Sequence, residues 1–138
     1  MGKYMVVKFI SLIIVFVLII CPASGSENDP ESVVGKQVDA YNMRDLETFL
    51  SFYHDEIIIY SFPDEVLMSG IDEIRPFYKS RFDNAPELHC EILERIVFGN
   101  YVLDYERITG IPDTDVVYAL LIYEVVDNVI KQVWIMRK

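Results

Sequence analysis

The chain has 138 residues, of which 52% are hydrophobic, so it can build one domain with a sizeable core but not two. It carries 22 acidic against 12 basic side chains, which gives a net charge of −10 at neutral pH. Because proteins bind nucleic acid mainly through Lys and Arg that neutralise phosphates, this balance argues against a nucleic acid as partner.

Residues 1–25 have the pattern of a secretory signal peptide. Lys3 and Lys8 make the start positive, an apolar run follows over residues 9–21, and small residues that offer a cleavage site come next. A membrane anchor is the alternative, but this run is shorter than the roughly 20 residues that span a bilayer. Acylation of Cys21 is a third interpretation, which would leave the protein lipid-anchored.

The expected mature domain spans residues 26–138, in a secreted or periplasmic protein that leaves the membrane once the signal peptide is cleaved. Cys90 is its only cysteine, so no intramolecular disulfide can form, and its setting in a strand is more typical of a small core residue than of a nucleophile. Neither His54 nor His89 has a partner at metal-ligand spacing, and no glycine-rich phosphate loop is present. We therefore expect neither a metal nor another cofactor.

Three helices are expected before the main strands. Asp29 is an N-cap residue in front of a proline and predicts a helix over residues 30–43. Asp45 can cap a second, short helix, and a third is predicted over residues 71–82, with Pro76 making its first turn irregular. Each helix has an apolar stripe at helical spacing, so all three need a sheet to pack against.

The strands follow from apolar runs separated by turn residues. Residues 56–62 and 66–68 predict a strand and a short return strand, and two long hairpins are predicted over residues 88–111 and 116–137. Turn-forming pairs such as Gly99-Asn100 fit these hairpins. Helices followed by antiparallel strands indicate an α+β fold, in which a strongly bent antiparallel sheet wraps around the N-terminal helices as a cone-shaped barrel.

The first hairpin brings three polar residues to one side. Its turn sets Glu94 opposite Tyr105, and Arg107 follows on the same side of the ribbon. We assign this side to the interior, where Glu94 would be a general acid or base and Arg107 would hold an anionic or carbonyl group. The alternative is structural: Glu94 and Arg107 pair across the hairpin and keep a polar interior satisfied. Under both interpretations, Asp104 and Glu106 would point to the opposite face, toward solvent or a partner.

The second hairpin supplies further residues for the same pocket. Its turn sets Tyr123 opposite Gln132 and Leu121 opposite Trp134, on the side that we expect to face inward. The candidate ligand-binding residues are then Gln37, Tyr105, Arg107, Tyr123, Gln132 and Trp134. The other side of the hairpin would be an exposed apolar face, which usually marks an interface. We therefore expect a homodimer through the sheet, formed by Leu120, Ile122, Val133 and Ile135.

Four segments carry a family resemblance: AYNMRDLETFLSFY at 40–53, GIDEIRPFY at 70–78, DYERITG at 104–110 and IYEVVDNVIKQVW at 122–134. In this order they resemble the nuclear transport factor 2-like superfamily, in its SnoaL-like branch, and they cover nearly all of the mature chain. The resemblance implies the cone-shaped fold. That fold hosts isomerases, cyclases, dehydratases, binding proteins and transport adaptors, so it does not imply one function.

Two mechanisms known in this superfamily can be compared with the residues present. Ketosteroid isomerase uses an aspartate base with a tyrosine and a protonated aspartate, and the resemblance places Ser61, Gln37 and Leu121 at these positions, none of the required type. SnoaL-type cyclases use an inward His/Asp pair, but His89 falls on the face opposite Glu94. The resemblance therefore supports neither mechanism here.

Three functions remain compatible with the residues. The first is an exported pocket protein that binds a small, largely apolar molecule. The second is an acid–base isomerase, cyclase or dehydratase that uses Glu94, Tyr105 and Arg107. The third is a protein-interaction module that acts through the outer face of the sheet.

Overall fold

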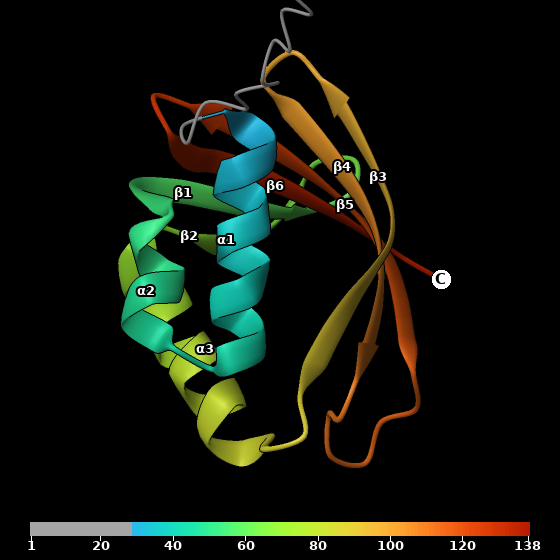
Figure 1. Cartoon of the computed structure of the whole chain (residues 1–138). Coiled ribbons are helices and arrows are strands. Elements are labelled where there is room, and N and C mark those ends of the chain that lie inside the picture. The colour runs from blue at the N-terminus through green and yellow to red at the C-terminus, as the bar shows by residue number, and fades with distance from the viewer. Residues whose placement is uncertain (1–28) are drawn as a thin grey trace, which may run out of the picture.

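The computed structural model describes residues 29–138, which form three helices and one six-stranded sheet (Figure 1). In chain order the elements are α1 (Pro30–Met43), α2 (Leu46–Ser51), β1 (Tyr53–Ser61), β2 (Glu65–Ser69), α3 (Ile71–Asn84), β3 (His89–Phe98), β4 (Tyr101–Thr109), β5 (Val117–Val126) and β6 (Val129–Arg137). No helix in this part of the chain is long and apolar enough to cross a bilayer. The expected signal peptide, the alternative membrane anchor and the Cys21 acylation site all lie outside the described residues.

The predicted caps hold the first two helices in place. The Asp29 carboxylate accepts a hydrogen bond from the Ser32 amide at 2.7 Å, and Asp45 accepts one from the Thr48 amide at 3.2 Å. The irregular turn predicted at Pro76 is absent, because α3 is helical throughout its length. Pro76 has no backbone N–H, so α3 loses one backbone hydrogen bond there and otherwise continues.

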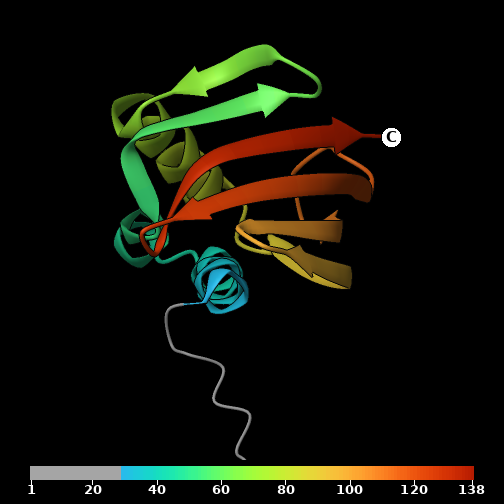
Figure 2. The same cartoon turned by 90° about the horizontal axis from the view of Figure 1, so that it is seen from above.

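The sheet has the strand order β2-β1-β6-β5-β4-β3. All neighbouring strands are antiparallel except β1 and β6, which pair in parallel and join the first strand of the chain to the last. Figure 2 shows how strongly the sheet curves, with the helices on its concave side. The α+β cone predicted from the sequence is confirmed, but the sheet is mixed and not wholly antiparallel, and it stays open and does not close into a barrel.

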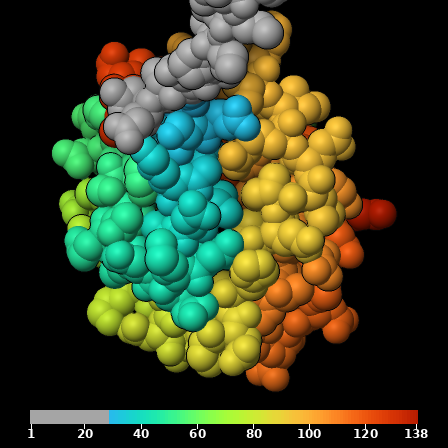
Figure 3. Space-filling model, in the orientation of Figure 1, coloured from blue at the N-terminus to red at the C-terminus, as the bar shows by residue number. Residues whose placement is uncertain are grey.

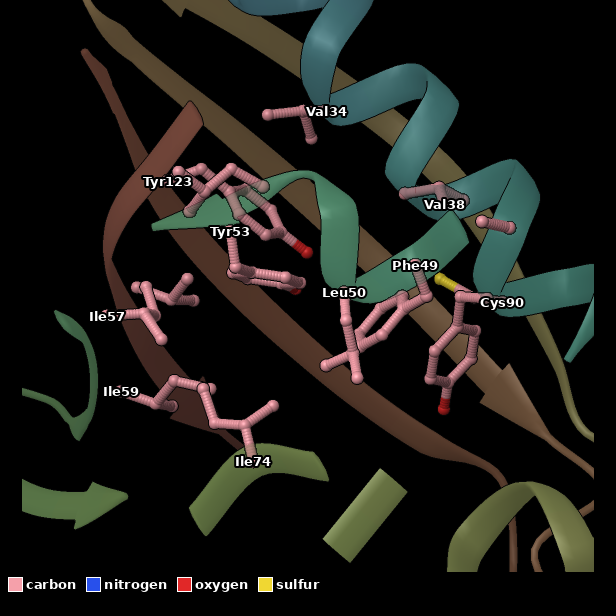
Figure 4. Close-up of a cluster of buried hydrophobic side chains, with 14 of the residues drawn as sticks. Val34, Val38, Phe49, Leu50, Tyr53, Ile57, Ile59, Ile74, Cys90 and Tyr123 are labelled. Atoms are coloured by element: carbon pink, nitrogen blue, oxygen red, sulfur yellow. The ribbon is translucent and has the colours of Figure 1, made fainter. Parts of the chain in front are cut away.

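The core lies between the helices and the concave face of the sheet. α1 packs against β3 to β6, whereas α3 packs against β1 and β2. Figure 4 shows Val34 and Val38 of α1 and Phe49 of α2 in one cluster with Ile57 and Ile59 of β1. These five side chains are at most 7% exposed and belong to one continuous apolar cluster. Burial of such aliphatic groups is the main force that holds the helical layer to the sheet.

A side-chain amide ties α1 to β3, which is an edge strand of the sheet. Asn42 Nδ2 donates to the Cys90 carbonyl at 2.9 Å, and the Cys90 amide donates to Asn42 Oδ1 at 2.7 Å. Both hydrogen-bonding groups of Cys90 on the free edge are thereby satisfied. Figure 3 shows the side chains of α1 against those of β3 along this side of the molecule.

The first hairpin has the predicted register near its turn but the opposite orientation. Glu94 pairs with Tyr105 as predicted, and an irregularity between Ile92 and Glu94 then shifts Arg107 opposite Glu91. The side that holds Glu94 and Tyr105 faces away from the helices, so its assignment to the interior is wrong. The turn determines which residues share a side, but only packing against the helices determines which side is buried.

The second hairpin departs from its predicted register. An irregularity between Glu124 and Val125 moves Tyr123 opposite Val133, and Trp134 opposite Ile122. Because one extra residue reverses the side to which each later residue points, β6 is turned over relative to the prediction. Val133 and Ile135 therefore face the core and not the expected dimer interface, whereas Gln132 and Trp134 face outward.

Candidate functional site

A cavity of about 540 Å³ lies between the helices and the concave face of the sheet. Most of its lining side chains are aliphatic or aromatic, and its charged lining residues are Arg81, Glu106 and Arg137. Leu67 and Phe77, which are 43% and 41% exposed, mark its opening between β2 and α3. Fully buried residues form its inner end, so the cavity extends from solvent into the core.

Glu106 of β4 is the buried carboxyl group of this cavity, with 3% of its surface exposed. The Tyr123 hydroxyl donates a hydrogen bond of 2.9 Å to its Oε1. Burial raises the pKa of Glu106 from its ordinary value of 4.5 to about 7; the Tyr123 hydrogen bond lowers this pKa and the Asp104 charge raises it. Glu106 can thus hold or release a proton near neutral pH, which is what a general acid or base requires.

Gln37 of α1 lines the same cavity as Glu106 and is 4% exposed. Its Oε1 atom has no hydrogen-bond partner among the described residues. A buried carbonyl oxygen without a donor is costly, and such atoms in native proteins usually have a partner. A donor group on a bound molecule would satisfy it.

The Cys90 thiol also lines the cavity and is hydrogen-bonded to Glu106. Burial, together with the charge of Glu106, raises the pKa of Cys90 well above its usual range. The thiol therefore stays protonated at neutral pH and acts as a small core residue, not as a nucleophile.

Asp104 lies two residues before Glu106 on β4, so both side chains point to the same side of the sheet, and Asp104 is fully buried. Arg95 of β3 holds it in a two-point ion pair, with Nε 2.7 Å from Oδ1 and Nη2 2.6 Å from Oδ2. Such fork-shaped pairing compensates for the loss of hydration of the carboxylate. Asp104 is therefore held by Arg95 beside the cavity, and Glu106 is the carboxyl group that lines the cavity.

Comparison with known proteins identifies the family of this chain. The sequence pattern of the SnoaL-like domain matches residues 34–132, most of the chain. The chain belongs to the SnoaL-like domain family. No functionally curated protein matches it significantly in sequence.

Solved structures share the fold of this SnoaL-like domain at low sequence identity. An uncharacterised cystatin-fold protein from Novosphingobium aromaticivorans has a TM-score of 0.74 and 22% identity over 79% of this chain and 98% of its own. A protein from Kribbella flavida provisionally named a ketosteroid isomerase has a TM-score of 0.67 and 17% identity, covering 79% and 77%. A protein from Jannaschia provisionally named a SnoaL-like polyketide cyclase has a TM-score of 0.66 and 14% identity, covering 82% and 89%. At these identities the likeness concerns the fold alone.

The SnoaL-like domain brings only two of the sequence-predicted ligand-binding residues, Gln37 and Tyr123, to the cavity wall. Tyr105 is 40% exposed on the outer face, where its ring stacks on Tyr118 at 6.1 Å. Arg107 donates to Glu91 at 2.7 Å and not to Glu94. Neither the expected catalytic cluster nor its structural alternative, an interior Glu94–Arg107 pair, is therefore formed.

The remaining two candidates are also directed away from the cavity. Trp134 stacks on Tyr60 of β1, with ring centroids 5.5 Å apart and planes 12° from parallel. Gln132 pairs with Glu124 in the ladder between β5 and β6. Both lie on the outer face because of the irregularity in the second hairpin.

The residue that sequence reasoning missed is Glu106, and one signal could have found it. The predicted register of the first hairpin already sets Arg95 opposite Asp104. A cross-strand Arg–Asp pair can bury a carboxylate, so the side of β4 that carries Asp104 and Glu106 was a possible interior. The interior was assigned instead to the side where Ile92, Ile96 and Leu103 accompany Glu94, because the two carboxyl groups on the other side suggested solvent or a partner.

Proposed function

We propose that this SnoaL-like domain binds a small, largely apolar molecule in the cavity. The observation that carries the proposal is the cavity itself, which at about 540 Å³ has a mainly apolar wall and a few converging polar groups. Ligand pockets commonly have roughly 300–1,000 Å³ and this composition. The buried Oε1 of Gln37, which lacks a hydrogen-bond donor within residues 29–138, supports a bound molecule with a donor group.

Native mass spectrometry of the protein purified gently from its own host tests this proposal. We expect a small-molecule adduct, which Leu121→Trp removes because Leu121 lines the cavity. Ile122→Trp is the matched control, since the next residue of β5 points to the outer face and pairs with Trp134. Absence of an adduct in the wild type, or equal loss in both variants, would contradict cavity binding.

A second candidate function is acid–base catalysis on the bound molecule. The observation that favours it is Glu106, whose pKa is raised by burial to about 7 beside the Tyr123 hydroxyl. Glu106 would transfer the proton and Tyr123 would orient it, in an isomerisation, cyclisation or dehydration. The outward positions of Glu94, Tyr105 and Arg107 leave them without this role.

Hydrogen exchange on the ligand separates catalysis from binding. If Glu106 transfers protons, the wild-type protein in D₂O should introduce deuterium at a carbon of the ligand recovered from the host. Glu106→Gln should slow this exchange about 100-fold or more while the adduct persists. Equal exchange in the two proteins would exclude Glu106 as the acid or base.

We also propose that the protein is exported, on the basis of residues 1–25 alone. The charged start, the apolar run and the small residues before Ser26 support this. The intact mass of the protein from its host tests it. A chain that starts at or near Ser26 is expected, whereas a chain that retains Lys3 and Lys8 would contradict cleavage.

A further inference from the structure

Two of the three charged side chains that line the cavity are arginines, Arg81 of α3 and Arg137 of β6. Neither takes part in an ion pair within residues 29–138. The other arginines of this region have partners: Arg44 donates to backbone carbonyls, and Arg75, Arg95 and Arg107 pair with carboxylates. In a chain with a net charge of −10, three of the six arginines in this region pair with no carboxylate, and two of these three, Arg81 and Arg137, line the cavity.

The two guanidinium groups share one aromatic neighbour in the cavity wall, Tyr78. Both charges act on the Tyr78 hydroxyl. The Arg81 guanidinium is hydrogen-bonded to the Tyr41 hydroxyl and lies 4.9 Å from the centroid of the Phe77 ring. This end of the cavity therefore presents N–H and O–H donors to its interior, together with positive charge.

The inner end has the opposite character. Its polar groups include the Gln37 Oε1 acceptor and the Glu106 carboxyl group, which accepts from the Tyr123 hydroxyl. A second anionic group on a ligand would be repelled there by Glu106, whereas a hydroxyl group could donate to Gln37. Between the two ends the wall is apolar, with residues such as Leu121, Val133 and Ile135.

We propose that the molecule bound in the cavity is an amphipathic monocarboxylate whose head group lies between Arg81 and Arg137. Its apolar body extends inward along the sheet toward Gln37. Guanidinium groups bind carboxylates through paired, charge-assisted hydrogen bonds, and a pair without competing acids keeps this capacity for a ligand. This inference rests on the proposed binding function and names the class of ligand.

Isothermal titration with matched pairs of probes tests this inference. The pairs are 4-phenylbutanoate with 4-phenylbutanol, 2-naphthylacetate with 2-naphthylethanol, and decanoate with decanol. At about pH 6 Glu106 is mostly neutral whereas a simple carboxylic acid is ionised. We expect the acid of at least one pair to bind at least about fivefold more tightly than its alcohol.

Substitution of the two arginines should remove this preference without removing the pocket. In the double variant Arg81→Gln, Arg137→Gln the acid should bind no more tightly than the alcohol, whose own affinity should change less than about twofold. The double variant with lysine at both positions retains the charges and should keep most of the preference. Arg75→Gln is the control, because Arg75 lies on the same helix but pairs with Glu47 on the surface.

The outcomes separate this inference from the function on which it rests. Alcohols that bind as tightly as acids, or a preference that survives in the glutamine double variant, overturn the carboxylate inference and leave the apolar pocket intact. Binding of neither member of any pair overturns both. Loss of alcohol binding in the glutamine variant would show that the arginines are structural, and would also overturn the inference.

Discussion

A carboxyl group on the inner face of a sheet can avoid the cost of burial by pairing with a cation or by keeping its proton. Asp104 and Glu106, two positions apart on β4, show the two solutions side by side. Arg95 pairs with Asp104 in a two-point contact. Glu106 has no such partner, so burial raises its pKa to about 7 and it holds a proton below that pH.

The raised pKa of Glu106 predicts that stability depends on pH. The folded chain keeps a proton that the unfolded chain releases between pH 4.5 and about 7. The contribution of Glu106 to stability is therefore fully present below pH 4.5 and is lost as the pH rises to about 7. Relative to Glu106→Gln, the wild type should lose up to about 3 kcal/mol of unfolding free energy over this range.

Urea unfolding of both proteins at about pH 5 and pH 8 measures this difference. Glu94→Gln is the matched control, because Glu94 lies on the exposed side of β3. If the unfolding free energies of the wild type and Glu106→Gln change by the same amount between the two pH values, the pKa of Glu106 is not raised in the folded protein.

At the scale of elements, close contact between a strand end and a loop fixes the position of the first hairpin. Gly110 directly follows β4 and has φ of +79°. A Cβ atom there would lie 1.9 Å from the Glu87 carbonyl oxygen, in the loop before β3. This contact, with the Asn42 amide on Cys90, holds β3 and β4 in place beneath α1 and so positions Glu106.

Gly110→Ala should therefore destabilise the fold. The clash is with backbone that cannot rotate away, and the positive φ adds strain, so we expect a loss of about 3 kcal/mol or more. Gly99→Ala is the control: its φ is +58°, but a Cβ there meets nothing within 4 Å, so only about 1 kcal/mol of strain is expected. Equal losses of unfolding free energy in the two variants would show that the close contact with Glu87 does not affect stability.

At the scale of the whole molecule, the convex face of the sheet carries a row of neighbouring apolar side chains. Ile122 occupies its middle, paired with Leu103 of β4 and Trp134 of β6, and the Trp134 ring continues onto Tyr60 of β1. Large apolar faces of this kind usually mark an interface. We propose that a second copy of the chain covers this face. The interface predicted from the sequence included Val133 and Ile135, but these two residues face the core.

Light scattering on a sizing column tests the dimer at micromolar concentration. The wild type should have the mass of two chains, and Ile122→Asp should have the mass of one, because a buried unpaired charge is costly. Ser80→Asp adds the same charge to the exposed side of α3 and should leave the dimer intact. A wild-type monomer would contradict the proposal, and a complex with a different protein that Ile122→Asp breaks would favour an interaction module.

Local features of the sequence determined the elements, because caps, turns and apolar periodicity act over a few residues. Asp29 and Asp45 begin their helices as predicted, Val129–Arg137 is the predicted last strand, and the register next to the Gly99-Asn100 turn is correct. The order of these elements also led to the right family and fold.

The tertiary structure alone decided which faces are buried. A bulge of one residue in each hairpin depends on how the sheet bends over the helices, and it reverses the direction of every side chain beyond it. The burial of Asp104 and Glu106 depends on partners from other strands, Arg95 and Tyr123, which local patterns do not reveal. The sequence by itself thus predicted a pocket in this fold, whereas long-range packing determined that Glu106 and not Glu94 lines the cavity.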